Sequence, residues 1–346
     1  MANIAGTIFV GLSLLVASIL PSQAGPALLY EPLSGKVLYS EDMDQLWHPA
    51  SLTKMMTAYI VFQDIRAGKL TLKSKIHNSK SAQAEPPSKL GLPLKATLIL
   101  NTALKALIVK SANDVAVMLA EAVGGTKEAF VARMNATAKR LGMSRTHYVN
   151  PNGLPDKGQI TTARDLARLT RAIIKEFPEY AHYWKTKSFR LGKRRLRSHN
   201  GLLRRFDGAD GMKTGFICDS GFNVVASATR GGRRLIAIVL GEPSGKERTI
   251  RASSILEYGF RQYFWKTYFN SSTIDNMPVN NNAGPVKSVR QTVTAYSCGN
   301  RPSMRRKQRA KLKARAARRA RLRAARRSQQ LTQAAKGAGN QAAAAR

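Results

Sequence analysis

Three short motifs in this sequence contain the residue types that nucleophilic catalysis needs: a hydroxyl, an amine that can accept a proton, and polar groups that can bind an anion. They are Ser51-Leu52-Thr53-Lys54, Ser111-Ala112-Asn113 and Lys213-Thr214-Gly215. Helical residues three apart share a face, so the Lys54 amine can reach the Ser51 hydroxyl. Burial lowers the pKa of a lysine and can leave a neutral amine that acts as a base. The first motif therefore predicts an activated serine nucleophile.

Each motif alone has a plain structural explanation. The first can be a helix cap followed by a surface lysine, the second a turn between helices, and the third a simple turn. Ser198-His199-Asn200 repeats the second pattern elsewhere in the chain. Together, however, the motifs occur in order on a helix start, an inter-helix turn and an edge strand. This set is typical of the penicillin-binding enzymes and class A β-lactamases.

The elements around the motifs predict an α+β fold. Two apolar runs flanking Pro32-Leu33-Ser34-Gly35 predict a hairpin, and the later run Phe222–Thr229 and its partner Arg234–Leu240 predict a second one. Apolar periodicity predicts helices over 51–66, 97–123, 126–141, 162–175 with Thr162 as its cap, and 253–268. Strands at both ends predict an antiparallel sheet formed by N- and C-terminal strands flanked by helices, with an inserted all-helical subdomain.

The N-terminus predicts export. Residues 8–20 are almost wholly apolar but too short for a comfortable membrane span, and Pro21-Ser22-Gln23-Ala24 then offers small residues for cleavage after Ala24. Residues 1–24 are therefore interpreted as a signal peptide of an exported, periplasmic protein, either free or peripheral to a membrane. No Lys or Arg precedes the apolar run, so an uncleaved anchor or a buried N-terminal helix remains the alternative.

The basic residues are concentrated at the C-terminus. The chain has 57 Lys and Arg against 20 Asp and Glu, and residues 301–327 hold fourteen basic residues and no acid. Residues 1–300 still carry 41 basic against 20 acidic residues, a net charge of +21. We expect a catalytic domain over 25–268, a linker over 269–300 with one strand near 288–296, a basic helical segment over 301–327 and a disordered tail over 328–346.

A surface of anionic lipid or lipopolysaccharide would relieve the repulsion between like charges three and four apart in the basic segment. The sequence therefore predicts electrostatic adhesion to an envelope surface, with a solvated tail that binds nothing as the alternative. No nucleic-acid partner is expected, because an exported protein would rarely meet one. Cys218 and Cys298 make neither a disulfide framework nor a metal site, and two free thiols are expected although export permits one bridge.

The longer surroundings of the motifs resemble the low-molecular-mass penicillin-binding proteins that are D-alanyl-D-alanine carboxypeptidases, of the serine β-lactamase-like superfamily. The resemblance spans about residues 26–265 and rests on these stretches: Tyr39-Ser40, 48–58, 110–114, 150–156, 161–165, 199–203 and 210–216.

The resemblance implies a mechanism and a cellular role. Ser51 would attack the bond between the last two D-alanines of a peptidoglycan stem pentapeptide, with Lys54 taking its proton and Ser111 relaying it to the leaving amine. The substrate-binding residues would be Asn113, Lys213, Thr214, Gly215 and Phe216, with the backbone N–H groups of Ser51 and Phe216 as the oxyanion hole. β-Lactam antibiotics would acylate Ser51, and no metal or cofactor would be needed. Such an enzyme would act in peptidoglycan biosynthesis and cell shape.

The chain also departs from this family. Members commonly carry a β-rich second domain and an amphipathic anchoring helix, and only 32 residues separate Tyr268 from Arg301. Three rivals stay open: an endopeptidase that cuts D-alanyl cross-links, a serine β-lactamase and a non-catalytic envelope-binding protein. The β-lactamase would need a Glu-x-x-x-Asn setting between the second and third motifs, and no acid there has Asn four residues on. The intact motifs argue against the non-catalytic protein.

Overall fold

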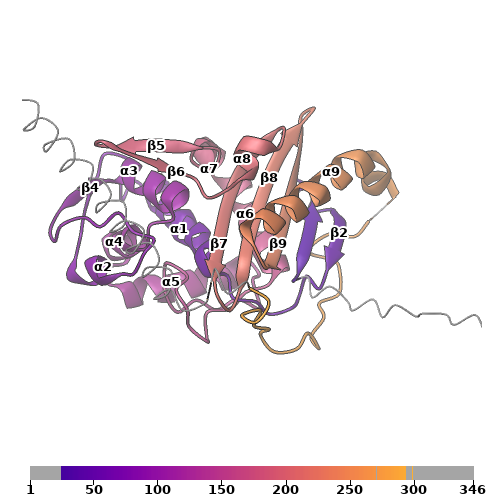
Figure 1. Cartoon of the computed structure of the whole chain (residues 1–346), viewed down its shortest axis with the longest axis horizontal. Coiled ribbons are helices and arrows are strands. Elements are labelled where there is room, and N and C mark those ends of the chain that lie inside the picture. The colour runs from indigo at the N-terminus through magenta and orange to yellow at the C-terminus, as the bar shows by residue number, and fades with distance from the viewer. Residues whose placement is uncertain (1–24, 270, 294–297, 299–346) are drawn as a thin grey trace, which may run out of the picture. The chain divides into compact units, whose positions relative to one another are not determined.

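The computed structural model describes residues 25–269, 271–293 and 298 (Figure 1). The predicted signal peptide, basic segment and C-terminal tail lie outside these residues. The described residues up to Lys287 belong to one compact unit, and those from Ser288 onward belong to a second. No helix among the described residues is long and apolar enough to cross a membrane.

Strands from the two ends of the first unit form one antiparallel sheet, as predicted. Among the described residues its strand order is β2-β1-β9-β8-β7. The strands are β1 (Ala27–Tyr30), β2 (Val37–Glu41), β7 (Ala209–Ile217), β8 (Gly221–Arg230) and β9 (Arg233–Glu242). Strand β1 pairs with both β2 and β9, so that Leu29 faces Tyr39 on one side and Ala237 on the other. The Lys213 motif lies on β7, which is an edge strand.

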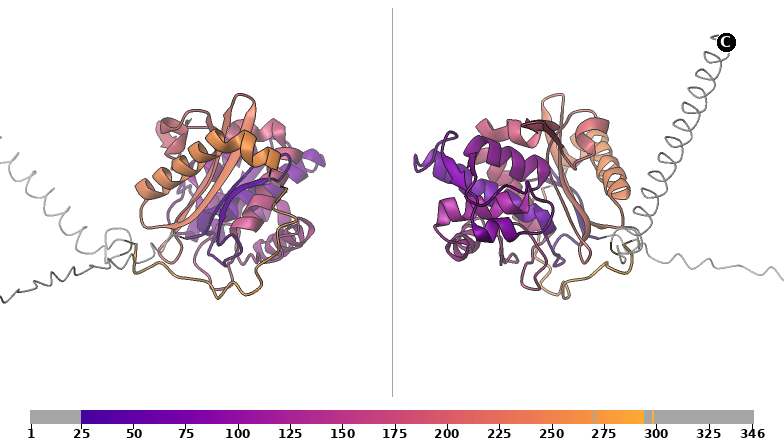
Figure 2. Two further views of the ribbon diagram at one scale, coloured as in Figure 1. Left: turned by 90° about the vertical axis from the view of Figure 1, so that its right-hand side faces the viewer. Right: turned by 60° about the vertical axis from the view of Figure 1, so that its left-hand side comes forward.

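Helices cover both faces of the sheet. On one face α9 (Gly245–Phe269) packs Ala252, Ile255 and Leu256 against inward side chains of the strands, and Figure 2 shows this helix lying across the sheet. On the other face α6 (Ala163–Glu176) meets β1, where the Tyr30 hydroxyl donates to the carbonyl of Ala167 at 2.9 Å. The Thr162 side chain caps α6 by accepting from the Asp165 N–H, as predicted.

The helical insertion lies beside the β7 edge of the sheet (Figure 1). Its elements are η1 (Ala50–Thr53), α1 (Lys54–Arg66), β3 (Lys75–His77), α2 (Lys80–Ala84), β4 (Thr97–Ile99), α3 (Leu100–Lys105), η2 (Ala106–Lys110), α4 (Asn113–Gly124) and α5 (Lys127–Arg140). The prediction of one helix over 97–123 was wrong. Residues 97–99 pair with β3 instead, and the chain breaks at Ser111, whose φ of 59° is left-handed.

Short elements between α6 and β7 were not predicted. They are η3 (Pro178–Tyr180), α7 (Ala181–Trp184), β5 (Ser188–Leu191), β6 (Arg194–Arg197) and α8 (Leu202–Arg205). The β5–β6 hairpin is rich in arginine and has only one buried residue, Leu196, so it lacks the apolar alternation that marks a strand.

The segment after α9 lies against the folded domain. Arg164 donates to the carbonyl oxygens of Ile274, Met277 and Pro278 and forms a buried ion pair with Asp44. The strand expected near 288–296 does not form over residues 288–293, which are turn and coil, and residues 294–296 lie outside the described part. Here the backbone N–H groups of Thr292 and Val293 both donate to the carbonyl of Val289, and such local bonds form a turn instead of a strand.

The expectation of two free thiols was also wrong. Both Cys218 and Cys298 are disulfide-bonded. Their separation of 80 residues along the chain places no limit on their distance in space, so the sequence alone could not decide between thiol and disulfide.

Candidate active site

Ser51 lies in η1, directly before α1, on a segment that is held by hydrogen bonds on one side and by close packing on the other. The preceding Trp47 donates its indole N–H to the carbonyl of Ser220 at 3.0 Å. The buried Asn223 donates from Nδ2 to the carbonyl of His48 at 3.0 Å. On the other side Gly153 lies so close that an added Cβ would overlap the carbonyl of Ala50, and its φ of +80° also favours glycine. These contacts fix the backbone that presents the Ser51 hydroxyl.

The Lys54 amine is fully buried and lies 3.0 Å from Oγ of Ser51. It donates to Oδ1 of Asn113 at 2.8 Å and to the backbone carbonyl of Asn152 at 2.5 Å. Burial, and secondly the charge of Lys213, hold the pKa of Lys54 well below its usual value. A neutral amine has two N–H groups and one lone pair. Because the two carbonyl oxygens bind the N–H groups, the lone pair is left for the Ser51 hydroxyl.

The second motif lies where η2 ends and α4 begins. Asn113 is held in one orientation, since its Nδ2 donates to the carbonyl of Pro86 at 2.9 Å while its Oδ1 faces Lys54. The following Asp114 accepts from the backbone N–H groups of Leu90 and Gly91. The loop around residues 86–91 is thereby fastened beside the motif, and Ser111 is presented at the break between the helices.

The third motif joins the site from the sheet. The buried Lys213 amine donates to Oγ of Ser111 at 2.8 Å and to the carbonyl of Thr214 at 2.9 Å. Burial, followed by the charge of Arg248, lowers the pKa of Lys213 to about 7. Asn200 steadies the start of β7 by donating to the carbonyl of Gly211 at 2.8 Å. The six polar side chains named from the motifs therefore lie on α1, α4, β7 and the turns next to them.

Strand β7 approaches the turn before Ser51 without room for a side chain. A Cβ added at Gly215 would lie 2.9 Å from the carbonyl oxygen of Pro49 and 3.1 Å from the backbone nitrogen of Ser51. The next residue, Phe216, is half-buried and packs its ring on Phe222 with centroids 4.2 Å apart. The backbone nitrogens named for an oxyanion hole thus belong to two chain segments in close contact.

Three further residues of this site lie outside the three catalytic motifs. Asn152 provides a carbonyl oxygen, which every residue has, so its type gives no signal. Burial raises the pKa of Glu85. A hydrogen bond with Asn152 and the charges of Lys127 and Lys54 lower it by less. Arg248 is buried and donates to the carbonyl of His199 at 3.2 Å, and its charge acts on Lys213. Glu85 and Arg248 are distant in sequence from the motifs whose electrostatics they affect.

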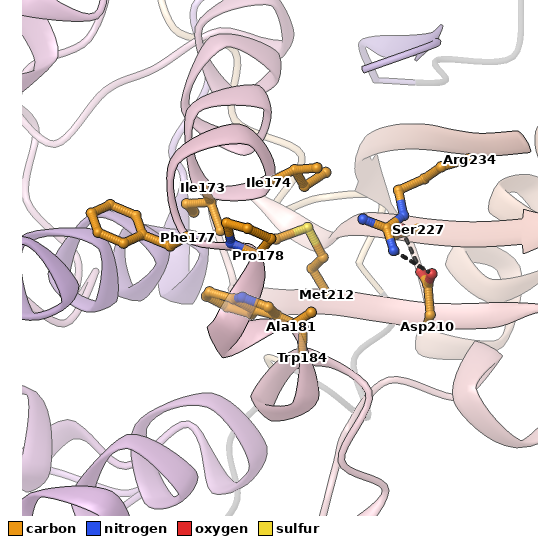
Figure 3. Close-up of a pocket in the computed structure, with 10 residues that line it drawn as sticks. All are labelled: Ile173, Ile174, Phe177, Pro178, Ala181, Trp184, Asp210, Met212, Ser227 and Arg234. Atoms are coloured by element: carbon orange, nitrogen blue, oxygen red, sulfur yellow. Dashed lines mark hydrogen bonds and ion pairs between the residues drawn. The ribbon is translucent and has the colours of Figure 1, made fainter. Parts of the chain in front are cut away.

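A separate pocket of about 130 Å³ lies beside α6, α7 and the start of β7 (Figure 3). Its walls are mainly apolar and include Phe177, Trp184 and Met212. Asp210 at its edge pairs with Arg234 at 3.2 Å and accepts from Ser227. None of the motif residues lines this pocket, so it is not the place where Ser51 would meet a substrate.

Comparisons with known proteins agree with the motifs. A family model described as D-alanyl-D-alanine carboxypeptidase matches residues 16–244. The carboxypeptidase DacC of Escherichia coli is 38% identical over 241 residues, covering 68% of this chain and 60% of that protein. DacF of Bacillus subtilis is 32% identical over 253 residues, covering 70% of this chain and 64% of that protein. The chain therefore spans less than two thirds of these relatives' own lengths.

Solved structures give the same family. Penicillin-binding protein 5 from Haemophilus influenzae matches with a TM-score of 0.67 and 35% identity, over 70% of this chain and 73% of that one. The residues matched by the family model, 16–244, include the strands of the sheet, the helical insertion and all three motifs. From the shared fold and the match to the family model, this protein belongs to the D-alanyl-D-alanine carboxypeptidase family.

Proposed function

We propose that this protein is a serine D-alanyl-D-alanine carboxypeptidase that removes the terminal D-alanine from peptidoglycan stem pentapeptides. One observation carries the proposal: the Lys54 amine, with its two N–H groups bound to carbonyl oxygens, lies 3.0 Å from the Ser51 hydroxyl. A lysine placed in this way is a base poised beside a nucleophile. The family membership supplies the substrate class.

The chemistry follows from the positions of the side chains. Ser51 Oγ forms a bond to the carbonyl carbon of the penultimate D-alanine while its proton passes to Lys54. The negative charge that develops on the carbonyl oxygen is stabilised by the backbone N–H groups of Ser51 and Phe216. Ser111 relays the proton from Lys54 to the departing amine, so that Lys54 is neutral again, the C–N bond breaks, and free D-alanine leaves an ester on Ser51. Water then hydrolyses the ester, with Lys54 accepting its proton, and regenerates the hydroxyl.

The terminal carboxylate of the substrate requires a cationic site. Lys213 and Thr214 on β7 are assigned to it, and we add Arg248, which is buried and acts electrostatically on Lys213. Burial lowers the pKa of both cations, and the charge of Arg248 lowers that of Lys213 further, so a bound anion would stabilise their charged forms. This explains why the site would favour a free C-terminal carboxylate over the interior of a peptide.

The test compares the wild-type chain with Ser51→Ala. Fluorescent penicillin should label wild type covalently, and a stem pentapeptide should release D-alanine, whereas Ser51→Ala should do neither. Absence of both reactions in folded wild type would contradict the enzymatic proposal. Rapid turnover of penicillin would indicate a β-lactamase, and cleavage of cross-linked dimers faster than pentapeptide would indicate an endopeptidase. A listerial penicillin-binding protein of similar fold, at 32% identity, has been crystallised in a cefotaxime-bound form, which favours β-lactam binding at this kind of site.

Location and surface partner form part of the proposal. Export to the periplasm is supported by the apolar N-terminal stretch, and envelope adhesion by the fourteen basic residues within 301–327. Pelleting with anionic vesicles across a salt series should show strong binding at low salt that is weakened when residues 301–346 are removed. Binding that is unchanged by the deletion would refute a role for the basic segment.

A further inference from the structure

The C-terminal end of α9 exposes four large aromatic side chains next to one another. Phe264, Trp265, Tyr268 and Phe269 are 68%, 64%, 83% and 65% exposed, and we call them the aromatic patch. Residues 264 and 268, and likewise 265 and 269, are one helical turn apart and therefore share a side of the helix. The rings of Trp265 and Phe269 lie with centroids 4.4 Å apart. Large apolar side chains that are exposed next to one another are typical of interaction surfaces.

Cations adjoin the aromatic patch. The Arg233 guanidinium lies over the Phe264 ring, 3.9 Å from its centroid, and over the Tyr263 ring at 4.9 Å. Arg261 is exposed one turn before the patch. No acidic residue occurs from Tyr258 to Phe269. The surface therefore combines aromatic rings with positive charge, on a chain whose residues 1–300 already carry a net charge of +21.

We propose that the aromatic patch docks the folded domain on the surface of a bilayer that contains anionic phospholipid. Tyr and Trp rings have an apolar body and a polar edge, which suits the boundary between headgroups and acyl chains. The neighbouring arginines would contact lipid phosphates, at about 1 kcal/mol for each cation near the surface. A patch with this charge has little attraction for a second copy of an equally basic chain. The proposal rests on export, which brings a bilayer within reach, and not on the catalytic mechanism.

Docking through this end of α9 would leave the candidate active site open. The patch lies near the start of β9, where Arg233 is located, whereas Lys213 lies on β7, at the edge of the sheet that faces the helical insertion. In Figure 1 the end of α9 is at the right and the helical insertion is at the left. A domain held at the patch could therefore still receive peptidoglycan from the opposite side.

Tryptophan fluorescence of the full chain tests the proposal directly. The chain has three tryptophans, of which Trp47 and Trp184 are 2% and 4% exposed, so Trp265 is the exposed reporter. Vesicles of phosphatidylglycerol and phosphatidylcholine should shift the emission to shorter wavelength, and acyl-chain-brominated lipid should quench it. Both signals should be lost in Trp265→Phe. Vesicles of phosphatidylcholine alone should give a weaker response, because the arginine contacts are lost.

Substitutions separate the patch from the basic segment. Phe264→Ser with Phe269→Ser should weaken binding about ten-fold or more for each ring removed from the interface. Ile250→Ser is the matched control, because Ile250 is 53% exposed on the same helix but distant from the patch. Labelling by fluorescent penicillin, measured in parallel, reports whether each variant is folded and tests the enzymatic proposal separately.

Three results would overturn the inference. One is an unchanged Trp265 emission while the chain pellets with the anionic vesicles, which would mean that other segments bind alone. Another is poor quenching of Trp265 by acrylamide without vesicles, which would mean that the chain covers its own patch. The third is a dimer in solution that Phe264→Ser dissociates, which would identify a second copy as the partner.

Discussion

The Lys213 amine and the Ser111 hydroxyl meet at 2.8 Å, although 102 residues separate them in the chain. Lys213 belongs to the edge strand of the sheet, and Ser111 to the junction of two helical elements. Their hydrogen bond therefore joins the two parts of the domain across the candidate site. It also links the group assigned to the substrate carboxylate with the group assigned to the leaving amine.

The pKa of Lys213 predicts a loss of activity at high pH. Burial lowers it to about 7, and only the cationic form attracts a carboxylate. We expect kcat/KM for the pentapeptide to fall about ten-fold per pH unit above that pKa, mainly through a higher KM. Lys213→Arg should move the fall to higher pH, because arginine stays charged. A flat pH profile for wild type above neutrality would contradict the assignment.

Replacing Glu85 should alter the acidic limb of the pH profile for penicillin acylation. Lys54 must be neutral to accept a proton, and the negative charge of Glu85 favours its protonated form. Glu85→Gln should therefore lower the pKa of Lys54 and extend penicillin acylation to lower pH. Glu128→Gln, in which an exposed acid of α5 is changed, is the control and should leave the profile unchanged. A shift toward higher pH in Glu85→Gln would refute the electrostatic role.

The close approach at Gly215 predicts a defect in catalysis. In Gly215→Ala the new methyl would press on Pro49 and on the backbone nitrogen of Ser51. Displacement of an oxyanion-hole donor typically costs about 10²–10³ in rate, so acylation should slow by that order while the chain still folds. Gly284→Ala is the control, since an added Cβ there meets nothing within 4 Å. If Gly215→Ala is acylated at the wild-type rate, the close contact between β7 and the turn before Ser51 is not required for acylation.

The ion pair of Asp44 and Arg164 predicts a large effect on stability. Both side chains are almost fully buried, and their closest oxygen and nitrogen are 2.6 Å apart. Asp44→Ala leaves a buried charge without its partner, so the free energy of unfolding should fall by about 3–5 kcal/mol in urea titrations. Glu179→Ala breaks the half-exposed pair with Arg66 and should cost less than about 1 kcal/mol. Equal losses would mean that burial of the pair is unimportant.

Much of the fold could be predicted because it depends on local patterns. Apolar runs bounded by glycine marked the strands β1, β8 and β9, and Thr162 marked the start of α6 as a capping residue. The same reasoning failed at residues 97–123. Their apolar periodicity is continuous, but the backbone turns at Ser111. The residues after the turn bond to groups distant in sequence, and the backbone N–H of Asn113 donates to the carbonyl of Ser88.

The sequence by itself determined which residues can react: Ser51 and Lys54 are three positions apart on one helical face, and that spacing is local. Only the tertiary structure decided that Lys54 is buried, that the carbonyl of Asn152 and the amide of Asn113 bind its N–H groups, and that Arg248 acts on Lys213. A pKa depends on desolvation and on charges nearby in space. These are properties of the packed chain, so no motif could reveal them.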